Sequence, residues 1–284
     1  MTYYKAATLS DQHRQTEVSQ QSTNQTLPFN RILSIASNTF REAVRDRVLY
    51  NLVLFVLLIT ACAIFLGELT AGQEARTIVN LGLGACLLFG AFISIFVGVS
   101  LVSKEIEKRT VYAIFSKPIS RTEFILGKYL GLCLTLLVNV LVMGVGVSLA
   151  LLYVGGSNLA LSIWGAVFLI FLELTILTAV AILFSSFSSP ALSALLSFFI
   201  FIIGHFSASL RDLANNLGSS FAKYFFGFIY YFLPNLSHFS FIKNASHGDV
   251  PPLSAMLGAA AYAVVYVAIL LGITSLIFSR RNFK

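Results

Sequence analysis

Polar groups that could carry chemistry are rare in this chain, and one acidic residue lies well inside an apolar run. Glu173 holds that position, and Asn139 lies in the apolar run before it. An ionised carboxylate is costly in hydrocarbon, so Glu173 must face protein or a water-filled cavity, or bind a proton. We expect either a place on a translocation path or a structural hydrogen bond, with Asn139 as a candidate partner.

The cysteines and histidines form no catalytic or metal-binding pattern. Cys62, Cys86 and Cys133 lie in apolar runs without a CxxC pair, as expected of small packed side chains. None of the four His residues has a metal-ligand spacing, and we expect His205 to be structural. The sequence also has no GxxxxGK[ST] phosphate loop. It therefore predicts no catalytic residue, no metal site and no cofactor bound by this chain.

A compact charged stretch separates two apolar runs and reads KEIEKRTVYAIFSKPISRTEFILGKYLG, residues 104–131. It holds six Lys or Arg residues and three Glu residues. Ser120 and Glu123 form a capping box, which predicts that a helix begins at residue 121, while Pro118 ends any helix before it. A helix over 121–154 would be about 50 Å long against a hydrocarbon core of about 30 Å, so its start should project from the membrane.

The tip of this projecting hairpin is expected to be a short helix near residues 110–116. Its apolar and aromatic side chains suit a groove on a partner protein better than water. They are Val111, Tyr112, Ile114 and Phe115. The alternative is that the basic residues only satisfy the topology rule and reach toward lipid headgroups.

The elements that position these residues follow from composition. Of 284 residues, 57% are hydrophobic and only 11% are charged, against about 25% charged in a soluble domain. Several apolar runs exceed the roughly 20 residues that cross a bilayer as a helix. The net charge of +7 comes from basic residues beside the ends of these runs, which reports topology and not nucleic-acid binding. We predict an all-α polytopic membrane protein in contact with lipid.

Six apolar runs are predicted to be transmembrane helices. They cover residues 48–67, 78–103, 124–154, 160–184, 189–206 and 253–279. With this layout, fifteen of the 19 Lys and Arg residues fall on one side, together with both termini. The positive-inside rule then places both termini and the charged stretch in the cytoplasm. We expect a multi-pass protein of a bacterial cytoplasmic (inner) membrane.

The remaining segments complete one membrane domain. Residues 1–28 are polar without periodicity and predict a disordered tail. Residues 29–47 predict an amphipathic elbow helix in the interface plane, leading into the domain over 48–284. The loop over 207–252 lies outside and contains the aromatic segment FAKYFFGFIYYFLP, a predicted re-entrant or interfacial helix. Gly127 and Gly131 are spaced for close helix packing.

Two segments and the six-span layout resemble the permease subunits of ABC-2 type ATP-binding-cassette transporters. The segments are FREAVRDRVLYNLVLF, residues 40–55, and GVSLVSKEIEKRTVYAIFSKPISRTEFILGKYLG, residues 98–131. Within that family the sequence is most similar to the branch containing the permease of the nitrous oxide reductase copper-maturation transporter. The resemblance implies two copies of the permease, each bound by a separate cytoplasmic ATPase that holds ATP and Mg²⁺. In that branch the permease works with a periplasmic protein. By resemblance, the 207–252 loop would dock such a protein or gate the outer exit.

The resemblance also implies roles for particular residues. Residues 29–47 would be the connecting helix, with Phe29, Phe40, Arg41 and Arg45, and about 110–117 would be the coupling helix. Coupling to the ATPase would involve Glu105, Lys108, Arg109, Thr110, Val111, Tyr112, Ile114, Phe115, Lys117 and Pro118.

With what the resemblance implies, the expected protein is a homodimeric permease without enzymatic activity of its own. It would couple ATP hydrolysis in a partner ATPase to export or to mechanical signalling to an extracytoplasmic partner. One alternative is a membrane anchor that recruits a cytoplasmic protein, for which Glu173 and the outer loop would be dispensable. Another is an intramembrane enzyme that uses Glu173, which requires a second catalytic group within a span.

Overall fold

The computed structural model of the chain describes residues 28–44, 58–59, 62, 65, 72–107, 120–207, 227 and 233–280. In these ranges every regular element is a helix, in agreement with the predicted all-α class. The elements are α2 (Pro28–Ala43), α4 (Glu74–Glu107), α6 (Arg121–Tyr153), α7 (Ser157–Ser185), α8 (Pro190–His205), η2 (Leu236–Phe239), α11 (Ile242–Ser246) and α12 (Leu253–Arg280).

Four of these helices are long and apolar enough to cross a membrane, namely α4, α6, α7 and α12. They coincide with four of the predicted spans, so the chain is a multi-pass membrane protein. The predicted span over 189–206 is the apolar helix α8, which has 16 residues. At 1.5 Å per residue α8 is about 24 Å long, less than a hydrocarbon core of about 30 Å.

Several predictions fall outside the described residues. The tail up to residue 27 is one, and the first predicted span, 48–67, is described only at isolated positions. The tip of the charged hairpin, residues 108–119, and nearly all of the aromatic segment before Pro234 also lie outside.

Short turns fix the antiparallel order of the central helices. Gly155, with φ of 84°, and Gly156 reverse the chain between α6 and α7. Glycine is favoured at such a positive φ because it lacks a Cβ atom. Between α7 and α8 the turn ends at Ser189, and Pro190 occupies the first turn of α8, where its missing N–H is not needed.

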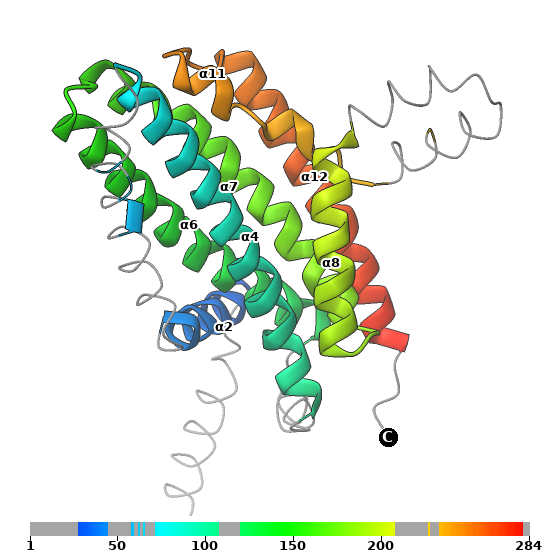
Figure 1. Cartoon of the computed structure of the whole chain (residues 1–284). Helices are drawn as coiled ribbons and strands as arrows, with labels where there is room; N and C mark the ends of the chain where they lie inside the picture. Colours follow the sequence, from blue (N-terminus) through cyan, green and yellow to red (C-terminus); the bar gives the residue numbers. More distant parts are fainter. Residues whose placement is uncertain are drawn as a thin grey trace, which may run out of the picture.

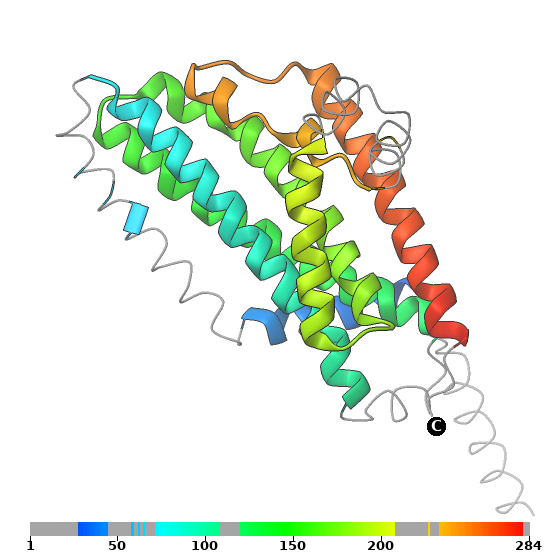
Figure 2. The ribbon, with the colours of Figure 1, turned by 45° about the vertical axis from the view of Figure 1, so that its right-hand side comes forward.

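Helix α7 forms the centre of the bundle, with α4, α6, α8 and α12 packed around it (Figure 1). The short elements η2 and α11 lie at the end where α4 and α12 begin (Figure 2). At the opposite end, α2 crosses the bundle close to the first turns of α6 (Figures 1 and 2). In both views α8 stops short of the end where α12 begins.

Candidate functional site

The start of α6 has the capping box that the sequence predicted. The backbone N–H of Glu123 donates to Ser120 Oγ at 3.2 Å, and the backbone N–H of Ser120 donates to Glu123 Oε2 at 3.0 Å. The two bonds satisfy N–H groups that a helix start leaves unpaired. The first turn of α6 is therefore fixed directly after residues 108–119.

Arg121, the first residue of α6, joins this helix to the end of α12. Its Nη1 donates to the carbonyl oxygens of Phe278 at 2.6 Å and Ser279 at 3.0 Å. Thr122 and Ser275 share a hydrogen bond of 2.8 Å beside it. A cation is favourable at a helix C-terminus, where carbonyl groups lack partners within the helix.

Two glycines of α6 form the seat of α2. A Cβ atom on Gly127 would lie 2.6 Å from Ile35 Cβ, and one on Gly131 would lie 2.5 Å from the carbonyl oxygen of Ala36. The close packing predicted for this glycine pair is thus confirmed, and its partner is the amphipathic helix. Part of the apolar face of α2 is covered by α6, while Phe29 and Leu33 remain exposed.

An ion pair lies beside this seat. Lys128 Nζ is 3.5 Å from Glu42 Oε2, and the lysine side chain is only 6% exposed. The ammonium group also lies 5.8 Å from the centre of the Phe124 ring. We call the contacts of α2 and α12 with residues 120–131 the α6 junction. It connects three helices where the described chain resumes after residues 108–119.

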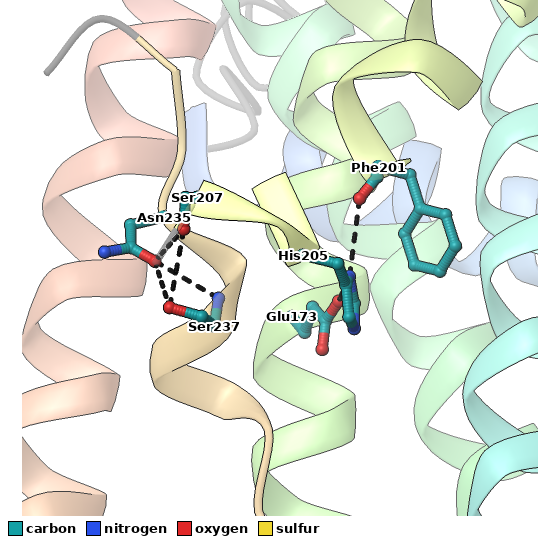
Figure 3. Close-up of polar contacts among 6 residues, drawn as sticks. All are labelled: Glu173, Phe201, His205, Ser207, Asn235 and Ser237. Carbon is teal, nitrogen blue, oxygen red and sulfur yellow. Dashed lines mark hydrogen bonds and ion pairs between the residues drawn. The ribbon is translucent and has the colours of Figure 1, made fainter. Parts of the chain in front are cut away.

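A second polar site lies in the middle of the bundle, around Glu173. This side chain is 1% exposed, and its Oε1 lies 3.4 Å from Nδ1 of His205 on α8 (Figure 3). The same nitrogen lies 3.3 Å from the carbonyl oxygen of Phe201. Neither carboxyl oxygen makes a hydrogen bond within the described part of the chain, because the contact with His205 has ion-pair distance without hydrogen-bond geometry.

Asn139 is buried on α6 but is not brought to Glu173. Its Nδ2 donates to the carbonyl oxygen of Thr135 one turn earlier, at 3.0 Å. Its Oδ1 has no hydrogen bond among the described residues. The sequence named the acidic residue of this site but not its neighbour, which is His205.

The end of α8 is covered by residues 234–237, which follow it in the chain. Ser207 Oγ donates to Asn235 Oδ1, which also accepts from Ser237 (Figure 3). Next to these hydrogen bonds, a Cβ atom on Gly204 would lie 2.7 Å from Leu236 Cγ and 2.9 Å from the carbonyl oxygen of Pro234. The Glu173–His205 contact therefore lies just inside the point where loop and helix meet.

Comparison with known proteins decides the family. A family model described as "ABC-2 family transporter protein" matches residues 33–283, which is most of the chain. The chain belongs to the ABC-2 transporter family. It is a membrane permease component of an ABC transporter. A search of curated proteins gives no match.

Within this ABC-2 permease, most of the predicted coupling residues lie outside the described residues. These are Lys108, Arg109, Thr110, Val111, Tyr112, Ile114, Phe115, Lys117 and Pro118. Glu105 belongs to α4, whose end projects beyond the neighbouring helices at the α6 junction (Figure 1). The coupling role of these residues stays a prediction.

The predicted connecting-helix residues are mostly described. Phe40 is partly buried, whereas Phe29 and Arg41 are exposed, and Arg45 lies outside the described residues. Arg41 lines a groove of about 800 Å³ along α2, together with Asn30, Leu33, Ser34, Ile35, Ser37 and Asn38.

The intramembrane-enzyme alternative required a second catalytic group within a span. His205 is a polar neighbour of Glu173 on α8, and membership of the ABC-2 family places the chain among transporter membrane components. Across the described ranges, no group of three His, Cys, Asp or Glu residues could hold a metal ion.

Proposed function

We propose that this permease exports its substrate as a homodimer and is driven by a separate cytoplasmic ATPase subunit. The ATPase would bind ATP and Mg²⁺. The permease would form the path across the membrane and would change conformation when the ATPase dimer closes. Its site would be a bacterial cytoplasmic membrane, with six spans and both termini in the cytoplasm. The distribution of Lys and Arg supports this orientation, because fifteen of 19 lie on the proposed inner side.

The α6 junction is the observation that carries this proposal. The charged hairpin returns to the bundle at Ser120, and the next residue already contacts the end of α12. Two turns later Gly127 and Gly131 hold α2. A force on the hairpin would therefore reach three helices through short, polar or close-packed contacts.

The resulting mechanism is mechanical. Closure of the ATPase dimer would push the coupling helix near 110–117, and the capped start of α6 would transmit the push without fraying. The connecting helix α2 and the end of α12 would follow, because Arg121 and the glycine seat join them to α6. Rocking of the first, second and fifth proposed spans would then alternate access between the two sides.

Glu173 is proposed to belong to the translocation path. It is buried near the middle of α7, about 24 Å from the start of the helix, and its oxygens lack hydrogen bonds in the described chain. Asn139 on α6, whose side-chain Oδ1 accepts no hydrogen bond among the described residues, is proposed to line the same path.

The outer loop, 207–252, is proposed to dock a periplasmic protein. This proposal is based on the similarity of the sequence to the copper-maturation branch of the family. It would let the permease pass mechanical work to an extracytoplasmic partner in addition to export.

The test is ATP hydrolysis by the permease complex purified from native membranes and placed in lipid nanodiscs. The wild-type chain should retain an ATPase whose activity vanadate inhibits. Tyr112→Ala combined with Phe115→Ala should lose most of this activity, because the apolar side chains of the coupling helix would be missing.

A matched control carries the same types of change on the proposed outer side, Tyr224→Ala with Phe228→Ala, and should keep the ATPase. If the first double variant retains association and activity while remaining folded, the coupling role is wrong and the membrane-anchor alternative becomes the better account.

A further inference from the structure

Two hydrogen-bond acceptors of the described chain lie near His205 Nδ1. Glu173 Oε1 lies 3.4 Å away and the Phe201 carbonyl oxygen 3.3 Å away. His205 is also the last residue of α8, where carbonyl dipoles favour positive charge. An Nδ1–H group can donate to either oxygen, whereas a bare Nδ1 could accept a hydrogen bond only from a protonated Glu173. The remaining question is whether the pair holds one further proton.

The electrostatic setting favours that further proton. Without it, a neutral imidazole faces an ionised carboxylate, and the pair carries a net negative charge inside the bundle. With it, the pair is neutral overall, either as two neutral groups or as an ion pair. A net charge without compensation is far more costly at this depth than a neutral pair.

No other cation compensates Glu173 in the described chain, where His205 is its one ion-pair partner. The other titratable groups on the helical parts of the elements that contact α7 are uncharged or lie toward helix ends. They are Cys86 with Glu74, Arg76, Lys104, Glu105 and Glu107 on α4, Arg121, Glu123, Lys128, Tyr129, Cys133 and Tyr153 on α6, His238 in η2, Lys243 in α11, and Tyr262, Tyr266 and Arg280 on α12. Of these, His238 contacts Asn235 and the ring of Tyr262.

We propose that Glu173 and His205 form a proton site, and that loss of its proton releases the end of α8 from α7. A proton fits where a larger ion does not, because the two side chains are already within 3.4 Å and no third His, Cys, Asp or Glu of the described chain joins them. The proton site would regulate the proposed translocation path. Its existence does not depend on the proposed function, but its regulatory role does.

The direction of the effect follows from comparing two states. In the packed state the pair keeps its proton. When α8 separates and water enters, the carboxyl group ionises, and above about pH 6.5 the imidazole is neutral, so one proton is released. Raising the pH above this value therefore favours the open state, by up to about tenfold per pH unit for one proton.

Opening at this point would reach the outer loop. Gly204 and Ser207 at the end of α8 contact Pro234, Leu236 and Asn235. Release of α8 would loosen these contacts, so the proton site would control from inside the bundle how the loop is held to the end of α8.

The first test is hydrogen–deuterium exchange of amides 203–207 in the full chain in nanodiscs, corrected for the intrinsic effect of pH. The opening constant should rise by up to about tenfold per pH unit above about pH 6.5 in the wild type. It should be independent of pH in Glu173→Gln, which keeps the shape but cannot ionise. His238→Gln, the control, should keep the wild-type dependence. An unchanged profile in Glu173→Gln would overturn the proposal.

A second measurement is read on the wild-type chain, and variants serve only to assign its signals. Histidine-labelled ¹⁵N NMR and infrared detection of protonated carboxyl groups on the wild-type chain should find the extra proton on either His205 or Glu173 at about pH 7.5, with His205→Gln and Glu173→Gln assigning the signals. A neutral imidazole beside an ionised carboxylate would refute the proton site. Both tests use the chain without an ATPase, so their failure is distinct from loss of the coupling function.

Discussion

Arg121 donates a hydrogen bond of 2.6 Å to the carbonyl oxygen of Phe278, which lies 157 residues later in the chain. A second bond, to Ser279, uses the same nitrogen. Both acceptors belong to the last turn of α12, where carbonyl groups have no partner within the helix. The first residue of one long helix therefore caps the end of another, directly beside the proposed coupling segment.

Replacing this residue by Arg121→Gln should detach the end of α12. Hydrogen bonds from a charged donor contribute about 1.5–3 kcal/mol when buried, and this partly exposed group should contribute about 1–2 kcal/mol. Amide exchange in residues 276–280 should accelerate accordingly, while the middle of α12 stays protected. Arg76→Gln, at the exposed start of α4, serves as the control and should leave exchange in α12 unchanged. Equal exchange in both variants would show that the cap contributes nothing.

The packing of α2 on α6 predicts that Gly131→Ala is destabilising, in contrast to a glycine substitution in open space on α4. In Gly131→Ala the new Cβ atom would lie 2.5 Å from the Ala36 carbonyl oxygen, so α2 must move. The expected loss is about 1–3 kcal/mol of unfolding free energy. In Gly84→Ala the Cβ atom meets nothing within 4 Å, and the gain in helix propensity should stabilise by up to about 1 kcal/mol. Reversible SDS titration in mixed micelles measures both values. A stabilised Gly131→Ala would contradict the observed packing.

The capping box gives a third prediction at the start of α6. Ser120→Ala removes the acceptor for the Glu123 amide and should cost about 1 kcal/mol. Exchange of the amides in the first turn of α6 should rise by about fivefold as a result. Ser189→Ala is the matched control, because Ser189 occupies the same position before α8 without a side-chain cap bond. If Ser120→Ala and Ser189→Ala raise amide exchange at their helix starts by the same factor, the capping box does not stabilise the start of α6.

Local sequence signals predicted much of this architecture. The capping box placed the start of α6 at residue 121, and hydropathy placed four long apolar helices where they occur. The Gly127 and Gly131 spacing indicated a close helix contact. These features are determined by residues that are close in the sequence, so they can be predicted from the sequence alone.

Contacts between distant helices could not be obtained in this way. His205 lies on a different helix from Glu173, and periodicity shows which face a residue occupies but not which helix meets that face. The sequence therefore suggested Asn139, which in the structure bonds to its own helix. The same limit hid the contact of Arg121 with α12 and the choice of α2 as the partner of the glycine pair.

The contact of Gly204 with the outer loop gives the last prediction. A Cβ atom at this position would lie 2.9 Å from the Pro234 carbonyl oxygen and 2.7 Å from Leu236 Cγ, so Gly204→Ala must push the loop away from the end of α8. Exchange of the amides in residues 236–240 should rise, because the hydrogen bonds among Ser207, Asn235 and Ser237 lose their alignment. Gly258→Ala, near the start of α12, has open space around its Cβ position and should leave these amides protected. If Gly204→Ala leaves the loop protected, the loop does not depend on this seat and would not follow the end of α8 when that helix moves.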